Sequence, residues 1–561
     1  MGKRNAGVGL AVIAILAGGL VPLAVQSAPV GAVTIGKARP DFNRDGFADS
    51  VISIDQQDFT GAADAGAVEI VYGNVFINGV APHHQKISNV NQTLKLNPTT
   101  NARFGQNTAY GDFNRDGYDD LAIGEFGATI DTFVAAGQVH IIYGSPSGLN
   151  PEGSVTVEGG GGYQNVNQAT SGVPDGPETG DEFGHSVAAG DINHDGFADL
   201  AVGVPREDLN GETQVGSLHV FFGSTTGLHF SANDPNLPSR YFHQGASGAL
   251  GTGLGDAAEH NDTFGTPLAI GDFNHDLFAD IAVGVAGEGI GDGITPGPSL
   301  MPASGGFYVL NGAAPANVGA TRTFITEATA GMPAAPGTDS RLGAYFAAGD
   351  FTGDGIVDLA VGADGKEIDG VPNAGSAYAF RGSGGGITTT GSIILSFATG
   401  WVRGDPVTGD NFGDALAAGD YNGDGRADLA IAVDKRELPG VAGADHGIVL
   451  VFPGSANVIL TANRGKYRGF SENTVGLPSG GAASGDEFGS LLRAGDFNHD
   501  GYLDLQISAA GKTVSAQPKA GAVYYLHGGT PGVMSVGSKI YTQATPGIEG
   551  DPQTNAYFGG T

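Results

Sequence analysis

The chain has 561 residues, of which 98 are glycine, 28 are proline and 40% are hydrophobic, so it can build a packed core and is not a disordered polymer. Acidic residues outnumber basic ones by 59 to 26, and the formal charge of -33 argues against nucleic acid or anionic lipid as a partner. The absence of cysteine excludes disulfides and thiolate chemistry.

The N-terminal segment has the pattern of a secretory signal peptide. Lys3 and Arg4 precede an apolar run from Val8 to Val25, and small residues follow around Ser27 and Ala28. We expect residues 1–28 to be a signal peptide and the mature protein to be extracellular, either secreted or in the cell envelope. An uncleaved N-terminal anchor is the alternative. No later stretch suits a membrane span, so no membrane insertion is expected after cleavage.

A nine-residue phrase recurs along the rest of the chain. It reads D-F-N-R-D-G-F-A-D at Asp41, and its seven copies begin 70 to 81 residues apart. They start at Asp41, Asp112, Asp191, Asp272, Asp350, Asp420 and Asp496. Such a regular spacing indicates a repeated structural unit.

The flanks of the phrase repeat as well. A Phe-Gly pair lies eight residues upstream in five copies, as at Phe104, and Leu342-Gly343 is a variant. A short apolar strand such as 199–203 follows, then a glycine-bounded strand such as 216–223 and a weaker strand such as 539–543. Four strands repeated seven times predict an all-β fold, a seven-bladed β-propeller of four-stranded antiparallel blades that forms one domain over residues 33–561.

In these features the sequence resembles the FG-GAP repeat family, found in the head of integrin α subunits and in many exported bacterial proteins. The resemblance depends on F-G, the phrase D-x-N-x-D-G-x-x-D and the following L-A-V-G. It departs from the pattern at Leu277, at Thr352 and in the strand after Asp504. The resemblance implies a calcium-loaded propeller that acts in adhesion or recognition.

Each phrase supplies the oxygen ligands that Ca²⁺ prefers, from its first, third, fifth and ninth side chains and a main-chain carbonyl at the seventh position. A strand follows where an EF-hand would have a helix, so we predict a calcium-binding β-hairpin, with up to seven structural ions. A plain hairpin rich in Asp and Asn is the alternative. The site at Asp272 should be the weakest, because Leu277 replaces the loop glycine. The predicted ligands are Asp41, Asn43, Asp45, Asp49, Asp112, Asn114, Asp116, Asp120, Asp191, Asn193, Asp195, Asp199, Asp272, Asn274, Asp276, Asp280, Asp350, Thr352, Asp354, Asp358, Asp420, Asn422, Asp424, Asp428, Asp496, Asn498, Asp500 and Asp504.

The first and last units are unusual. The first unit has Val33-Thr34 in the Phe-Gly slot, whereas the chain ends in a surplus Phe558-Gly559. A ring must close, so we predict that this terminal stretch pairs within the first blade. The alternative is that residue 561 is a truncation point.

The functional prediction is a recognition module without catalytic or cofactor-binding residues. The loops opposite the hairpins are long and polar, and we expect them to bind a protein or a glycan. An extracellular hydrolase or lyase, directed at a phospholipid or a glycan, is the alternative, with Glu125, Glu207 and Glu437 as candidate acids in the central funnel. A purely structural envelope protein is the third. The segment 184–188 looks like a nucleophile elbow, but sister repeats place other residues there, so the sequence favours a non-enzymatic role.

Overall fold

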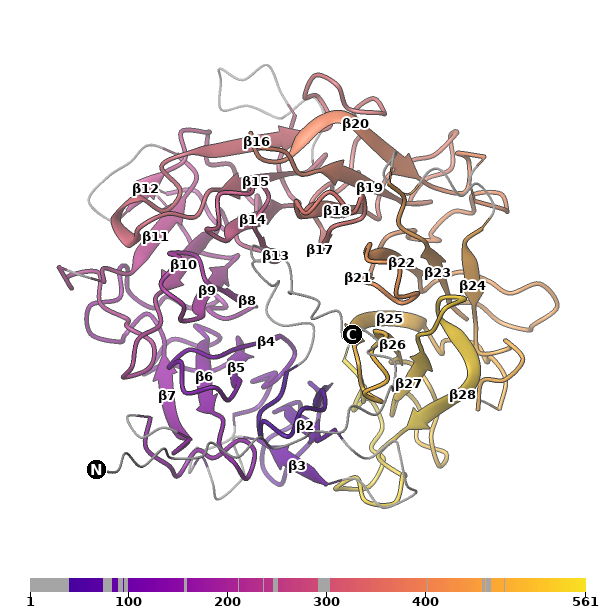
Figure 1. The fold of residues 1–561 in the computed structure, drawn as a ribbon, viewed down its shortest axis with the longest axis horizontal. Helices are drawn as coiled ribbons and strands as arrows, with labels where there is room; N and C mark the ends of the chain where they lie inside the picture. Colours follow the sequence, from indigo (N-terminus) through magenta and orange to yellow (C-terminus); the bar gives the residue numbers. More distant parts are fainter. Residues whose placement is uncertain are drawn as a thin grey trace, which may run out of the picture.

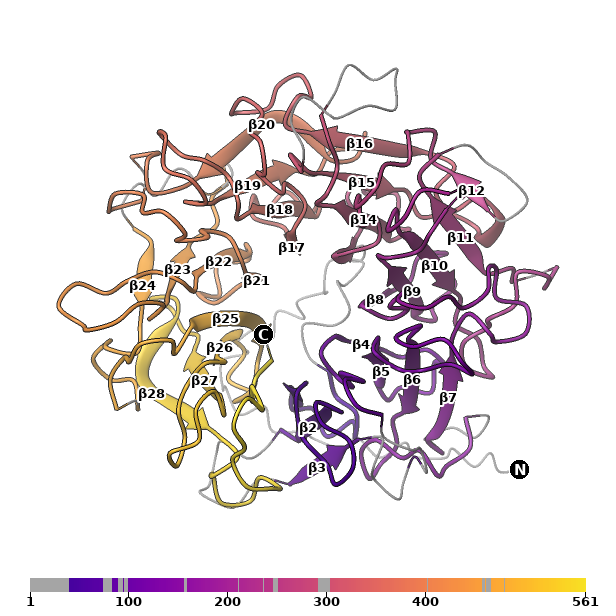
Figure 2. The ribbon, with the colours of Figure 1, turned by 180° about the vertical axis from the view of Figure 1, so that it is seen from behind.

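The computed structural model describes residues 40–560 except 74–82, 89–93, 95–98, 156–158, 210, 236, 246–250, 291–302, 401, 457–459, 461–465 and 479. The predicted signal peptide lies outside these residues. Seven sheets follow one another around a central axis, and blades 1 and 7 lie side by side (Figures 1 and 2). The predicted seven-bladed β-propeller is confirmed.

The first three blades carry strands β1 to β12. Blade 1 contains β1 (Ser50–Ile54), β2 (Ala67–Val71) and β3 (His84–Ile87). Blade 2 contains β4 (Thr108–Gly111), β5 (Asp120–Glu125), β6 (Gln138–Tyr143) and β7 (Gly162–Val166). Blade 3 contains β8 (Ser186–Gly190), β9 (Asp199–Val204), β10 (Ser217–Phe221), β11 (Arg240–His243) and β12 (Thr252–Gly253).

The other four blades have four strands each. Blade 4 contains β13 (Leu268–Gly271), β14 (Asp280–Val285), β15 (Gly306–Leu310) and β16 (Arg322–Thr326), with the 3-10 helix η1 (Pro315–Asn317) before β16. Blade 5 contains β17 (Tyr345–Gly349), β18 (Asp358–Ala363), β19 (Ser376–Arg381) and β20 (Thr388–Leu395). Blade 6 contains β21 (Leu416–Gly419), β22 (Asp428–Val433), β23 (Ile448–Phe452) and β24 (Arg468–Phe470). Blade 7 contains β25 (Phe488–Gly495), β26 (Asp504–Ala509), β27 (Ala522–His527) and β28 (Met534–Tyr541).

Two blades differ from the four-stranded expectation. Blade 1 has three strands among the residues described. Blade 3 gains the two-residue strand β12, which pairs in parallel with β11 in an insertion of the longest repeat. All other pairings within the blades are antiparallel. The ring therefore tolerates extra chain at its outer edge while the inner strands keep one register.

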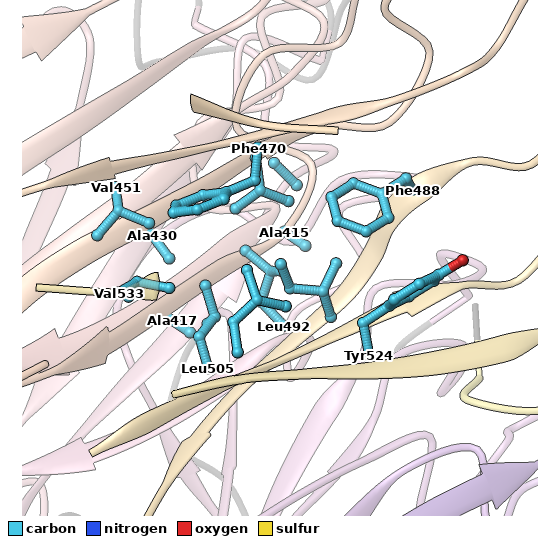
Figure 3. Packing of buried hydrophobic residues seen from close by; sticks show 14 of the residues in the cluster. Ala415, Ala417, Ala430, Val451, Phe470, Phe488, Leu492, Leu505, Tyr524 and Val533 are labelled. Carbon is cyan, nitrogen blue, oxygen red and sulfur yellow. The ribbon is translucent and has the colours of Figure 1, made fainter. Parts of the chain in front are cut away.

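Apolar residues are buried between adjacent blades rather than within one sheet. The strand after each hairpin in blades 2 to 7 is buried along its whole length, since a neighbouring blade covers each face. Between blades 6 and 7, Phe470, Phe488, Leu505 and Tyr524 share one buried cluster with Ala417 of β21 (Figure 3). Burial of such side chains contributes roughly 1.5–3 kcal/mol each, so the interfaces hold the ring together.

Each Phe-Gly pair joins two blades. The Phe183 N–H donates to the carbonyl of Ala136 in blade 2, and the Gly184 N–H donates to the carbonyl of Gly203 in blade 3. The terminal pair makes the same two bonds, from Phe558 to Ala520 at 2.9 Å and from Gly559 to Ser53 at 2.8 Å. The prediction that this stretch pairs within the first blade is confirmed.

A central cavity of about 340 Å³ is lined by the inner strands of blades 2 to 7 and by the start of β1 in blade 1. Its lining is largely apolar. Arg493 of β25 reaches blades 1 and 2, where its guanidinium donates to the Val51 carbonyl of β1 and to Oγ1 of Thr108 in β4, each at 3.2 Å. Burial lowers the pKa of Arg493. The arginine therefore satisfies the inner edge of β1 where the described chain has no further strand.

Candidate metal-binding hairpins

The seven Asp-rich phrases lie at one end of the ring. In blades 2 to 7 the phrase joins the inner strand to the second strand, as between β4 and β5. In blade 1 it leads directly into β1. Adjacent hairpins touch each other, which shows that all seven face the same way. Arg44 lies over the ring of Tyr118 at 5.9 Å, Arg115 lies over Phe197 at 5.7 Å, and His499 contacts Phe47 at 4.8 Å between blades 7 and 1.

The first and fifth side chains of each phrase hold the turn. In the first hairpin, Asp41 accepts the N–H groups of Asp45 and Gly46, both at 3.0 Å. Asp45 in turn accepts the N–H of Phe47 at 2.9 Å. The first aspartate makes the same pair of bonds in the six other hairpins. Local hydrogen bonds thus fix the carboxylates within one turn.

The ninth aspartate has a structural role that the sequence analysis missed. Asp49 is fully buried, and its two oxygens accept the N–H of Phe42 at 2.7 Å and that of Gly73 at 2.9 Å. Asp120, Asp199, Asp280, Asp358 and Asp504 also accept one N–H within the hairpin and one from the glycine after the third strand. The recurrent aromatic-Gly pair at the end of the third strand is the sequence feature that could have indicated this role, because its glycine donates the second N–H.

Burial and mutual repulsion perturb these carboxyls. Burial raises the pKa of Asp49 to about 8, and the nearby charges of Asp41 and Asp45 push it in the same direction. The pKa of Asp280 also rises to about 8, and those of Asp358 and Asp428 rise to about 7, again chiefly by burial. Three acids in one turn thus disfavour their own ionised forms unless a cation is present.

The hairpins supply the donor types of a hard divalent cation, although the three aspartates of one hairpin do not all come within 4.8 Å of one another among the residues described. Their donors are carboxylate, amide and main-chain oxygens, the set that Ca²⁺ prefers. Hairpins 5 and 6 fit less well, since Arg381 lies 3.3 Å from Asp354 and Arg426 lies 3.2 Å from Asp424. In hairpin 7, the imidazole of His527 lies 3.6 Å from Asp504. These bases compete for the oxygens that an ion would use.

Leu277 occupies the sixth position of the fourth hairpin with a φ of +77°. The other six hairpins have glycine there, with φ from +83° to +90°. A side chain in this left-handed region costs about 1–2 kcal/mol. The sequence-based reason for a weak fourth site, a strained residue in place of glycine, is therefore present in the backbone.

The opposite end of the ring carries the loops between the second and third strands. The three glutamates proposed as funnel acids lie there on separate blades. Glu125 accepts from His140 at 2.7 Å and Glu207 accepts from Gln168 at 2.6 Å, while Glu437 is exposed. The structure does not gather them as a catalytic pair.

Asp414 and Asp434 form an acid pair at this end. The Asp434 N–H donates to Oδ2 of Asp414 at 3.3 Å, and burial raises the pKa of Asp414 well above its ordinary range, with the Asp434 carboxyl adding to the shift. Lys435 lies 3.5 Å from Asp434. The buried Asp414 carboxyl therefore favours its protonated form.

No helix in the described part of the chain has the length and apolar character needed to cross a membrane.

The chain matches known proteins over parts of its length. The FG-GAP repeat model matches residues 104–142, 183–221, 412–444 and 488–526, each segment beginning at the phenylalanine of a Phe-Gly pair. The chain is 35% identical over 136 residues to phosphatidylinositol-glycan-specific phospholipase D of Rattus norvegicus, which covers 24% of this chain and 15% of that protein. It is 35% identical over 168 residues to integrin alpha-PS5 of Drosophila melanogaster, which covers 29% of this chain and 14% of that protein.

Among solved structures, a rhamnogalacturonan lyase of Bacillus licheniformis aligns over 78% of this chain and 72% of its own, with 12% identity and a TM-score of 0.27, and this alignment supports no further argument. The chain spans about a seventh of the length of the two curated relatives named above. Each segment that matches the FG-GAP repeat model lies within one blade of the propeller. The chain is a seven-bladed β-propeller that carries FG-GAP repeats in four of its blades and is related to integrin α subunits and to phosphatidylinositol-glycan-specific phospholipase D.

Proposed function

We propose that this protein is an exported calcium-binding β-propeller, one domain over residues 33–561 after removal of residues 1–28, that acts as an adhesion or recognition module. The observation that carries the proposal is the set of seven hairpins at one end of the ring, each with three carboxylates in one turn. They resemble the metal loops of the FG-GAP family, and the opposite end is left free for a ligand.

Calcium has a structural role in this proposal. The first, third, fifth and ninth side chains of each hairpin hold the ion, as Asp191, Asn193, Asp195 and Asp199 do in blade 3. An ion that binds the folded hairpin alone stabilises the fold by mass action. We expect chelation to lower the melting temperature and added Ca²⁺ to restore it. A melting temperature that is the same in EDTA and in Ca²⁺ would contradict this role.

The ligand-binding face is proposed at the end opposite the hairpins. In the loop after β5, Phe133 and Val134 expose 37% and 59% of their surfaces. The related turns of blades 3 and 7 have Glu212 and Gln517 where this loop has Phe133. An exposed aromatic residue on a rigid loop is a common anchor for a protein or a glycan.

The experiment is a glycan array together with a pull-down from the extracellular fraction, both with calcium-saturated protein. The double variant F133A/V134S should lose the ligand without a change in melting temperature. Val536→Ser removes a similar exposed group, 76% exposed, from the outer strand of blade 7 and should keep the ligand. Equal binding by the double variant and the wild type would move the ligand site elsewhere.

The alternative, an extracellular hydrolase or lyase, has the Asp414–Asp434 pair as its one supporting observation. The pair would act as proton donor and acceptor at the end of the ring opposite the hairpins. The wild type and the variant D414N would be assayed on glycan and phosphodiester substrates. Turnover that the variant abolishes would favour an enzyme over the recognition module.

A further inference from the structure

A second kind of acidic site lies far from the hairpins, at the outer end of the interface between blades 2 and 3. Glu178 and Asp181 belong to the loop between these blades, and Glu207 follows β9. One oxygen of each lies within 4.8 Å of the others. Asp181 is 2% exposed and Glu207 is 1% exposed, whereas Glu178 is exposed to solvent. The site therefore has a buried floor and an open entrance.

Gln168, two residues after β7, contacts Glu207 of this cluster. Its side chain is 3% exposed, and its Nε2 donates to Oε2 of Glu207 at 2.6 Å. Its Oε1 is buried and accepts no hydrogen bond among the described residues. A buried oxygen without a hydrogen-bond donor costs about 1–3 kcal/mol. A cation bound to this oxygen would offset that cost.

The corresponding interfaces of blades 5, 6 and 7 have a basic side chain where the interface of blades 2 and 3 has Glu207. Counted from the first aspartate of each phrase, Glu207 is the residue sixteen positions on, and blades 5, 6 and 7 have a base at that position. The Lys366 ammonium lies 2.8 Å from Glu327, and the Arg436 guanidinium lies 2.5 Å from Asp410. Lys512 lies 2.8 Å from Glu472 and 3.2 Å from Asp486. These three interfaces therefore carry their own cation between the acids.

The interface between blades 2 and 3 has an acid where those interfaces have the base. Asp181 corresponds to Asp410 and Asp486, so the acidic partner stays while the cation is lost. The neighbouring base, Arg206, binds Glu182 at 3.0 Å instead. Burial raises the pKa of Asp181 to about 7 and that of Glu207 well above its ordinary range, with the neighbouring acids adding to both shifts. Ionised carboxylates at this spacing need a positive charge.

We propose that Glu178, Asp181, Glu207 and the amide oxygen of Gln168 bind a hard divalent cation, Ca²⁺ or Mn²⁺, which takes the place of the basic side chain of blades 5, 6 and 7. All four donors are oxygens, and the exposed side of Glu178 leaves room for water ligands. The ion links two blades on the face away from the hairpins, so it is separate from the hairpin ions.

The interface between blades 3 and 4 repeats the composition, with Asp262, Glu288 and Gln244, whose Oε1 is also buried without a hydrogen bond among the described residues. Its acids do not reach the mutual distance found at Glu207 within the part of the chain that the structure describes. The proposal is therefore confined to the interface of blades 2 and 3.

The variants use residues that the molecule itself has at these positions. Glu207→Lys supplies the base of Lys366, and Asp181→Ser supplies the Ser340 found in blade 5. Glu212→Lys makes the same charge change on an exposed residue of the same loop and serves as the control. Metal content after equilibration with Ca²⁺ and desalting would be measured by elemental mass spectrometry for the four full-length proteins.

We expect E207K and D181S to hold one ion fewer per chain than the wild type, and E212K to match the wild type. A crystal soaked in Mn²⁺ should show an anomalous peak between Glu178, Asp181 and Glu207. Because the readout is a difference, it stands whether or not the hairpins bind calcium. If E207K does not fold, D181S carries the comparison. Equal metal content in all four proteins, or a soaked crystal without the peak, would overturn the proposal.

Discussion

The two ends of the propeller differ in how strictly they repeat. At the hairpin end, the first, fifth and ninth aspartates recur in all seven copies, and they bind backbone N–H groups. At the opposite end, the residue sixteen positions after the first aspartate is variable. It reads Gln57, Ala128, Glu207, Glu288, Lys366, Arg436 and Lys512. A side chain that satisfies the backbone has few substitutes, whereas side chains that meet one another can exchange charge and keep the fold.

The largest test of this contrast is the pH dependence of the metal-free protein. The pKa values of Asp49 and Asp280 rise from 3.8 to about 8 in the folded state, and those of the rim carboxyls Asp262 and Glu288 rise to about 8 and 9. A raised carboxyl binds protons in the native state that the unfolded chain has released. Its contribution is full below the unfolded pKa and is lost as the pH rises through the folded value.

In EDTA, the free energy of unfolding should therefore fall between about pH 5 and about pH 8, by about 1.4 kcal/mol per pH unit for each group that titrates. Urea unfolding at about pH 5 and at about pH 8 would measure this fall in the free energy of unfolding. Calcium binds the ionised hairpins, so it should stabilise most at the higher pH. A metal-free protein that gains stability toward about pH 8 would contradict the raised pKa values of these buried carboxyls.

Removal of the aspartate at the ninth position of a single hairpin should have the next largest effect on the free energy of unfolding. Asp199→Ala leaves the buried N–H groups of Ile192 and Gly223 without their acceptor, at about 1–3 kcal/mol each. The matched control is Asp195→Ala in the same hairpin, where the side chain is exposed and accepts the N–H of Phe197. Urea unfolding in EDTA separates this effect from loss of metal. Equal losses in the two variants would show that the ninth aspartate is not the anchor.

The sequence predicted the ring and the position of the candidate site. Repeated spacing, the Phe-Gly pair and the alternation of apolar residues define blades, because each feature acts within one short segment. The double role of Asp49 was not predictable in the same way. Its second N–H comes from Gly73, which reaches it only after β1 and β2 are paired. Nor could spacing show that Gln168 and Glu207, on different blades, share a hydrogen bond.

Relief of the strained turn should have a smaller effect, in the opposite direction. Leu277→Gly removes a side chain with φ of +77° that is 39% exposed, so little packing is lost. We expect the free energy of unfolding to rise by roughly 0.5–1 kcal/mol, since part of the relief is offset by the entropy of glycine in the unfolded chain. Differential scanning calorimetry would detect the shift. A fall in melting temperature would mean that Leu277 contributes packing instead.

The contacts between neighbouring hairpins should matter least. His499→Ala removes the ring that lies 4.8 Å from Phe47, the hairpin contact between blades 7 and 1. We expect a loss of about 0.5 kcal/mol for an exposed aromatic pair. His275→Ala is the control, because the next hairpin has Ile356 at the position of Phe47. A loss of stability as large as that of Asp199→Ala would mean that these ring contacts stabilise the fold as much as the aspartates that bind backbone N–H groups. That result would weaken the contrast between the two kinds of contact.

The bond from Gly559 to Ser53 sets the order of events during synthesis. Some 506 residues separate the two partners. At roughly 5–20 residues per second, a ribosome takes about half a minute to nearly two minutes to make that stretch. The bond between Gly559 and blade 1 can form only after that interval, although the residues of blade 1 emerge first. Translation therefore sets a lower limit on the time at which the circle is sealed.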